Sequence, residues 1–283
     1  MSIDWSKPVW PTKLVAIATD PNISPRKGFA DSPLPGRPPV YGQDIEFGVG
    51  RPAPRQYSVG TTEADLKPRM EKLLRIFASK DKTGMASRLF KKFLSKQTSV
   101  TFFEDADLNA AAANHHNISY FIAAAHGAPL PAGIPPQPGT VRIHQALRAA
   151  NWDITRLVVP TDLGVPAFNI GSKGFGTGDF ANGLGVMVNG VQHVYVLATH
   201  YHYDSITNFY GIKLRFLFYD VFGLDDDDLL EYGADKIQSS RRVLSSSDAE
   251  IGITAWWQLQ HQFGYAPLVT RIVVERSVVA VAL

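Results

Sequence analysis

Alternation of apolar and polar residues predicts that the C-terminal half of the chain is rich in β-strands. Residues 212–219 carry an apolar side chain at every second position, and residues 191–204 alternate in a similar way. Because successive side chains of a strand point to opposite faces, this period predicts an antiparallel sheet with one face covered. Asn189-Gly190 separates residues 182–188 from the first of these strands, and this dipeptide favours a type I′ hairpin turn.

Three other segments have strand character. Residues 154–160 (ITRLVVP) are predicted to form a strand, and a short strand is predicted at 13–18. The closing run 267–283 predicts one or two strands. Since this last run is so apolar, we expect it to be buried within the sheet.

A helical period dominates the middle of the chain. Apolar residues recur there at intervals of three and four, which is typical of helices packed on a core. The predicted helices are 61–77, 85–96, 104–126, 140–152, a segment that starts near 225, and 253–265. The fold class predicted from these elements is α+β.

The sequence divides into three parts by composition. Residues 1–60 hold ten of the 19 prolines and many glycines, which predicts an extended Pro/Gly-rich arm, or alternatively a docking segment for a partner. Residues 61–150 form the predicted helical region, and residues 151–283 form the predicted antiparallel β-rich part with the candidate site. The proline-rich stretch 129–139 lies near the boundary between the last two parts.

Charge and cysteine content narrow the functional classes. The net charge of +2 gives no reason to expect nucleic acid as a partner, and the lack of cysteine excludes disulfides and thiolate chemistry. No apolar run approaches the roughly 18 residues that span a bilayer, and the first ten residues lack the features of a signal peptide. We therefore expect synthesis in the cytoplasm and, if the protein is exported, export without a cleaved signal.

The helix at 85–96 has a basic face made by Arg88, Lys91, Lys92 and Lys96. Such a face is most often solvated, but an anionic membrane is a second candidate partner for it.

The sequence 199–204 (THYHYD) is one candidate for catalytic chemistry. On a strand, His200, His202 and Asp204 share one face, and two such imidazoles are typical ligands of a divalent metal such as Zn²⁺ or Fe²⁺. The string resembles the H-x-H-x-D-H signature of the metallo-β-lactamase superfamily, but Ser205 stands in place of the last histidine and the superfamily is not assigned. The alternative is that these residues are polar groups at the solvated end of a strand.

An acidic corner provides the second candidate. Asp220 ends a predicted strand, and four aspartates at 225–228 precede a predicted helix. Capping of that helix explains one or two of the four, and a hard cation is the alternative. If the aromatic helix at 253–265 lies over this corner, His261 can face Asp220 or Asp225 as a structural hydrogen bond or as a catalytic pair.

Two sequence blocks resemble a family of uncharacterised bacterial proteins. The first block comprises Asp220, Phe222, Gly223, Leu224, Asp225, Asp226 and Asp228; the second comprises Trp256, Trp257, Leu259, Gln260, His261, Gly264, Tyr265 and Pro267. Members of that family resemble type VI secretion effectors, which are antibacterial toxins exported without a cleaved signal. The resemblance implies an immunity protein and a carrier of the secretion apparatus as partners.

Taken with the candidate residues, the resemblance leads to the hypothesis of an effector that is a hydrolase. Two alternatives remain at this stage: a membrane-active or pore-forming toxin that uses the basic helix, and a non-catalytic binding or adaptor protein.

Overall fold

The protein is described by a computed structural model covering residues 8–26, 34, 36–54, 60–127, 143–161, 163–171, 176–234 and 247–282. The predicted α+β class is confirmed, because helices pack around a mixed, mostly antiparallel sheet of five strands. The proline-rich stretch 129–139, residues 172–175 of the glycine-rich loop and several residues of the predicted arm lie outside the described residues.

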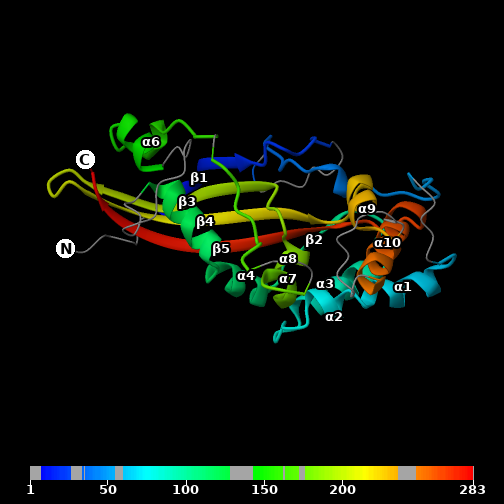
Figure 1. Ribbon diagram of the computed structural model, residues 1–283. Coiled ribbons are helices and arrows are strands. Elements are labelled where there is room, and N and C mark those ends of the chain that lie inside the picture. Colours follow the sequence, from blue (N-terminus) through cyan, green and yellow to red (C-terminus); the bar gives the residue numbers. More distant parts are fainter. Residues whose placement is uncertain are drawn as a thin grey trace.

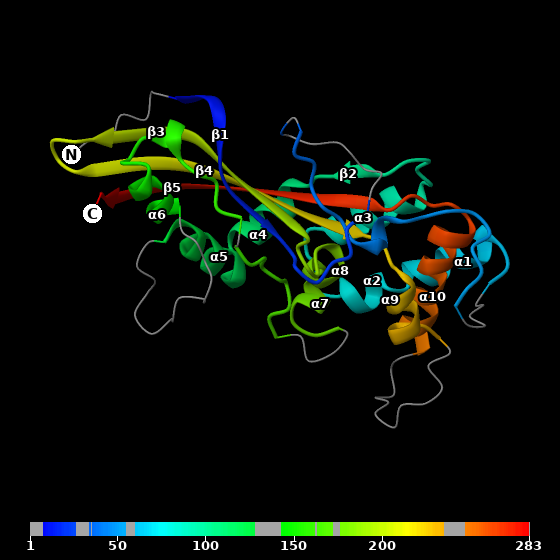
Figure 2. The ribbon, with the colours of Figure 1, turned by 90° about the horizontal axis from the view of Figure 1, so that it is seen from above.

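The sheet has the strand order β1-β3-β4-β5-β2, and among the named strands of the described residues only the β2–β5 pairing is parallel. Its strands are β1 (Pro8–Thr19), β2 (Thr101–Phe103), β3 (His193–Asp204), β4 (Phe209–Phe222) and β5 (Leu268–Val281). Figure 1 shows β3, β4 and β5 as one long twisted ribbon, and Figure 2 shows the same ribbon from above. All three parts of the chain that the composition distinguishes contribute strands to this sheet, including the strand predicted at 13–18.

Most helices are short. The helices are α1 (Glu63–Glu71), α2 (Leu74–Phe77), α3 (Met85–Leu94), α4 (Ala106–Ala113), α5 (His116–His126), α6 (Ile143–Ala149), α7 (Asp179–Asn182), α8 (Leu184–Met187), α9 (Asp226–Tyr232) and α10 (Ser247–Gln262), with 3₁₀ turns η1 (Gln43–Ile45) and η2 (Ile154–Arg156). Figure 1 shows α1, α9 and α10 gathered at one end of the sheet, with α6 near the other end.

Three local predictions are wrong. Residues 182–188 form parts of α7 and α8 rather than a strand, because Gly183 has a left-handed φ of 94° and starts a new turn of helix. The hairpin turn therefore lies between β3 and β4, where Asn208 has a φ of 57°. Residues 154–160 start as η2 because the Asp153 side chain accepts a hydrogen bond from Thr155 N.

The single helix predicted at 104–126 is broken into α4 and α5. His115 lies between them in extended backbone conformation, and its Nδ1 accepts a hydrogen bond from Asn117 N at 3.2 Å. Its Nε2 lies 2.9 Å from Asp179 Oδ2, which is also buried. His115 therefore serves as a helix cap that also ties the start of α5 to the first residue of α7.

Both faces of the central strands are covered, whereas one covered face was predicted. Val194 and Val196 belong to the large core that the helices share, while Tyr195 packs on the opposite face with Tyr41 and Ile45. The second cover comes from the N-terminal segment, which folds back over the sheet. As a result η1 lies against β4, close to the acidic corner.

The basic face of α3 is largely engaged within the molecule. Arg88 pairs with Asp105 and Asp107 at 2.7 Å each. Lys92 donates to the carbonyl oxygen of Phe102, and Lys96 pairs with Glu63. Lys91 is exposed. Within the described ranges, no helix has the length and apolar character needed to cross a membrane.

Candidate functional site

A cavity of about 500 Å³ lies where β4 leaves the sheet. Its walls are contributed by the η1 segment, the α7–α8 region, the end of β4, α9 and α10. The lining residues are Asp44, Phe77, Phe180, Gly185, Val186, Asn189, Gly190, Gln192, Asp220, Val221, Gly223, Leu224, Asp228, Tyr232, Ile253 and Trp256. A cavity of this volume can hold a small molecule or one unit of an oligomeric ligand.

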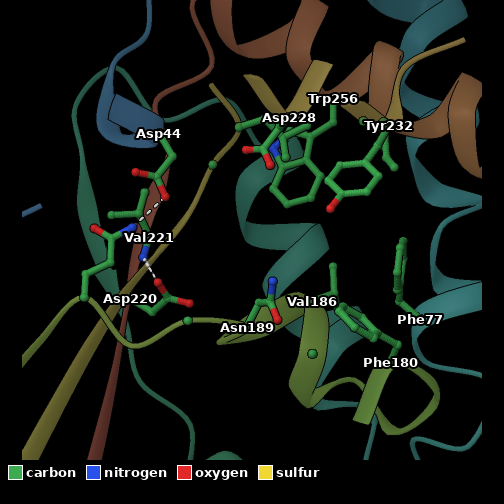
Figure 3. A pocket seen from close by; sticks show the side chains of 16 residues that line it. Asp44, Phe77, Phe180, Val186, Asn189, Asp220, Val221, Asp228, Tyr232 and Trp256 are labelled. Carbon is green, nitrogen blue, oxygen red and sulfur yellow. Dashed lines mark hydrogen bonds between the residues drawn. The ribbon is translucent and has the colours of Figure 1, made fainter. Parts of the chain in front are cut away.

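Three carboxyl groups from three separate elements line this cavity. Asp44 comes from η1, Asp220 from β4 and Asp228 from α9. Figure 3 shows Asp44 and Asp220 on one side of the cavity and the aromatic rings of Tyr232 and Phe180 on the other. Elements far apart in the sequence thus place an acidic wall opposite an aromatic wall.

Asp220 is the most deeply buried of the three, with only 6% of the residue exposed. Its Oδ1 accepts a hydrogen bond from Val221 N at 2.9 Å. Burial raises the pKa of Asp220 well above the ordinary value, and the charge of Asp44 raises it further. Asp220 therefore keeps its proton to a higher pH than an ordinary aspartate does.

The surroundings of Asp44 stabilise its charged form more than the surroundings of Asp220 stabilise the charged form of that residue. Burial and the nearby Asp228 raise the pKa of Asp44 to about 7, but a hydrogen bond from Gln192 opposes this rise. Gln192 Nε2 donates to Asp44 Oδ2 at 2.7 Å, and Gln192 Oε1 accepts from Gly42 N at 2.9 Å. Because the amide is fixed at both ends, it can only donate to Asp44, which makes this carboxyl the better candidate for a base.

Asp228 combines a structural role with a place in the cavity. Its Oδ2 accepts from Asp225 N at 3.2 Å, and Asp225 Oδ1 accepts from Asp228 N at 3.0 Å, so the two form a capping box at the start of α9. Burial and the neighbouring Asp225 raise the pKa of Asp228 to about 7. The capping predicted for the acidic run is confirmed, and one capping residue also faces the cavity.

The raised pKa of Asp44 predicts a specific pH dependence of stability. The unfolded chain loses this proton near the ordinary pKa of 3.8, while the folded chain keeps it up to about 7. Ionisation therefore favours the unfolded state, and the stabilising effect of the neutral carboxyl is lost as the pH rises from about 4 to about 7. Asp44→Asn should gain stability relative to the wild type across this interval, by at most about 1.4 kcal/mol per pH unit.

Chemical denaturation at several pH values measures this difference. Asp204→Asn is the control of opposite sign, because hydrogen bonds from Thr207 lower the pKa of Asp204. That variant should lose stability relative to the wild type as the pH rises through the acidic range. If the free energy of unfolding has the same pH dependence in Asp44→Asn and in the wild type, the raised pKa of Asp44 is contradicted.

The aromatic wall is built on the core. Trp256 stacks on Phe222 with ring centroids 4.2 Å apart, and Phe90 and Phe93 pack against the same pair. The buried indole N–H of Trp256 has no hydrogen-bond acceptor within the part of the chain that the structure describes. Tyr232 is 39% exposed and lies at the rim. The aromatic wall thus consists of a fixed inner ring, Trp256, and an accessible outer ring, Tyr232.

The two blocks behind the family resemblance are in contact around this cavity. Trp257 Nε1 donates to Asp226 Oδ1 at 3.1 Å, and Trp256 stacks on Phe222. Gln260 Nε2 donates to the carbonyl oxygens of Asp44, Glu46 and Leu224 at 2.9, 2.7 and 3.1 Å, and Leu224 N donates to Gln260 Oε1 at 3.0 Å. One amide therefore connects η1, the corner after β4 and α10.

Loss of that amide should loosen all three elements together. We expect Gln260→Leu to lower the free energy of unfolding by about 3 kcal/mol, because several buried backbone groups lose their partner. Urea unfolding measures the change. Gln262→Leu is the matched control on the same helix. We expect a smaller change, of about 1 kcal/mol, because its half-buried amide makes one long contact with Arg51 O at 3.4 Å and accepts one hydrogen bond from Gln258 Nε2 at 3.0 Å. Equal losses in the two variants would contradict this role.

The sequence-predicted site residues are only partly brought together. Asp220 lines the cavity, and Asp225 caps α9 beside it. His261 lies in the contact region of the two blocks, but its Nε2 donates to Leu224 O at 2.8 Å and its Nδ1 faces Arg51. Burial lowers the pKa of His261 and keeps the ring neutral. These contacts favour the structural hydrogen bond over a pair with Asp220 or Asp225.

His200, His202 and Asp204 lie on β3, toward the hairpin and away from the cavity. Asp204 holds the turn, since its carboxylate accepts from Ile206 N at 2.9 Å and from Thr207 Oγ1 at 2.6 Å. His200 Nδ1 lies 3.2 Å from Thr199 Oγ1. Among the described residues, no three His, Cys, Asp or Glu side chains are grouped as metal ligands, so metal binding by His200 and His202 stays a prediction.

Sequence analysis missed Asp44 and Gln192, and it considered Asp228 as a helix cap or cation ligand within the acidic run rather than as a catalytic residue. Asp44 lies in a Pro/Gly-rich segment without periodicity, and nothing local marks it as functional. Gly223 was the one indication in the sequence of a close backbone contact. In the structure, a Cβ at this position would lie 2.1 Å from the carbonyl oxygen of Asp44. A glycine after a buried strand indicates close approach of another backbone, but it does not say which one.

Comparison of the chain with protein-family models, curated proteins and solved structures finds no significant match. The functional interpretation therefore depends on the geometry of the cavity.

Proposed function

We propose that the protein is a hydrolase that works by carboxyl acid–base catalysis in the three-aspartate cavity. The observation that carries this proposal is the convergence of Asp44, Asp220 and Asp228, from three elements, on one cavity with an aromatic wall. Carboxyl groups in unlike environments can divide the roles of acid and base at neutral pH. The pKa values of Asp44 and Asp228, both raised to about 7, support the presence of both protonation states near neutrality, and the pKa of Asp220 is raised as well.

The roles follow from burial and hydrogen bonding. Asp220 is the general acid, because it is the most buried of the three and gives its proton to the leaving group. Asp44 is the general base, because the bond from Gln192 stabilises its charged form while it takes a proton from water. Asp228 adds negative charge beside Asp44 and so raises its basicity. Water supplies the hydroxyl group to the product, and the protonated leaving group departs.

The biological setting is part of the same proposal. The resemblance to type VI secretion effectors supports an antibacterial toxin, with an immunity protein and a secretion carrier as partners. An immunity protein that inhibits such an enzyme would be expected to cover the mouth of the cavity near Tyr232.

Expression in bacteria with and without export to the periplasm tests this proposal. We expect growth inhibition in one of the two compartments, because a hydrolase acts where its substrate lies. Asp228→Asn should relieve the inhibition, whereas Asp227→Asn should not, since Asp227 is exposed and lies outside the cavity lining. Equal toxicity of both variants and the wild type, at equal protein levels, would contradict catalysis in the cavity.

The alternative of a membrane-active toxin makes a different prediction. It requires Arg88, Lys92 and Lys96 to exchange their present partners for lipid headgroups. Dye release from anionic vesicles that persists in Asp228→Asn would favour that alternative. The adaptor alternative predicts neither dye release nor any dependence on the aspartates.

A further inference from the structure

The charges around the cavity restrict the substrate. The described residues that line it include three aspartates and the amides Asn189 and Gln192, but no lysine, arginine or histidine. Phosphate and carboxylate groups of a ligand need a cationic or backbone N–H partner to leave water. A phosphorylated or otherwise anionic substrate therefore fits this cavity poorly.

The two unlike walls restrict it further. A sugar ring has an apolar face of C–H groups and a rim of hydroxyl groups that both donate and accept hydrogen bonds. Tyr232 and Phe180 offer aromatic faces for the former, while the carboxyl groups of Asp44 and Asp220 on the other side suit the latter.

We propose that the cavity binds a neutral glycan, with one sugar ring between the aromatic wall and the carboxyl wall, and that the bond cleaved is glycosidic. This inference rests on the proposed hydrolase activity and adds its substrate class. Most glycoside hydrolases also use a pair of carboxyl groups for catalysis.

The reaction balances with the groups present. Asp220 donates its proton to the glycosidic oxygen as the bond from that oxygen to the anomeric carbon breaks. Water forms the new bond to the anomeric carbon, and Asp44 takes the proton that this water loses. Proton transfer from Asp44 to Asp220 through solvent restores the starting state, and no oxidant, reductant or further reactant is needed.

Binding is tested with the intact Asp220→Asn chain, which removes the proposed acid and keeps the cavity. An array of neutral oligosaccharides that includes tetra-N-acetylchitotetraose, cellotetraose and maltotetraose identifies binders, and calorimetric titration gives their affinities. We expect at least one neutral oligosaccharide to bind. Tyr232→Ala should weaken that binding about tenfold, the effect of one stacking contact. Phe47→Ala is the matched control, since Phe47 is 38% exposed and lies outside the cavity lining.

Spermine and a polygalacturonate tetramer serve as the cationic and anionic probes. Binding of spermine that is lost in Asp44→Asn, without binding of any neutral oligosaccharide, would overturn the glycan assignment in favour of an amine. Failure of every neutral oligosaccharide, or binding that Tyr232→Ala leaves unchanged, would overturn it as well.

The two proposals can fail separately. If neutral oligosaccharides bind in the cavity but the wild type releases no more reducing ends than Asp220→Asn, the glycan site stands and the hydrolase fails. If toxicity depends on Asp228 while no neutral oligosaccharide binds, the hydrolase stands and the substrate class is wrong.

Discussion

Asp220→Asn should lower the rate of the catalysed reaction by about 100- to 10,000-fold, the contribution expected of a general acid. The asparagine has nearly the same shape, and its carbonyl oxygen can still accept the hydrogen bond from Val221 N. The asparagine amide, however, is not acidic and cannot donate a proton to a leaving group. Growth inhibition on expression measures the effect first, and release of reducing ends from a bound oligosaccharide measures it directly.

Stability separates catalytic loss from misfolding in this variant. Because burial raises the pKa of Asp220, its ionisation opposes folding, and the neutral asparagine should leave the free energy of unfolding at pH 7 unchanged or higher. Asp227→Asn, at an exposed position of the same acidic corner, should keep wild-type activity. A fully active and stable Asp220→Asn protein would remove Asp220 from the mechanism.

Gly223→Ala should lower the free energy of unfolding by about 3 kcal/mol and reduce activity at the same time. A Cβ at this position would lie 2.1 Å from the carbonyl oxygen of Asp44 and 3.1 Å from Pro267 Cβ. The carbonyl group is backbone and the Pro267 Cβ belongs to a rigid ring, so η1 has to move and carries Asp44 away from Asp220. Urea unfolding and the activity of the remaining folded protein measure the two effects.

Gly48→Ala is the matched control for this substitution. Gly48 lies in the N-terminal segment, shortly after η1, and a Cβ at this position would meet nothing within 4 Å. We expect a change in stability of no more than about 0.5 kcal/mol and unchanged activity. Similar behaviour of the two alanine variants would mean that η1 does not pack against Gly223 as described.

Local pattern was a good guide to the C-terminal strands. The alternation in residues 212–219 predicted β4, and the acidic run at 225–228 predicted the cap of α9, because both depend on neighbours along the chain. The error at 182–188 has the same origin. An apolar run of that length fits a strand or buried helical turns equally well, and tertiary packing around Gly183 decides between them.

The candidate site was harder to predict than the strands around it. Asp220 was identified from its place at the end of a strand, but its partner Asp44 is separated from it by most of the chain. Their proximity in the cavity depends on the contact of the η1 backbone with Gly223 and on the hydrogen bonds made by Gln260. No periodicity in residues 1–60 encodes that contact. His261 drew attention as a titratable residue, yet its bond to Leu224 O gives it a structural place.

The central claim is that three carboxyl groups share one cavity and keep their protons to a higher pH than ordinary aspartates do. Carbon-detected NMR titration of the aspartate side chains between pH 3 and pH 9 tests it most directly, with Asp44→Asn, Asp220→Asn and Asp228→Asn to assign the signals. We predict that the pKa values of Asp44 and Asp228 are about 7, that the pKa of Asp220 is well above the ordinary value, and that removal of Asp44 lowers the pKa of Asp220. Three independent titrations near the ordinary aspartate pKa of about 3.9 would contradict the account.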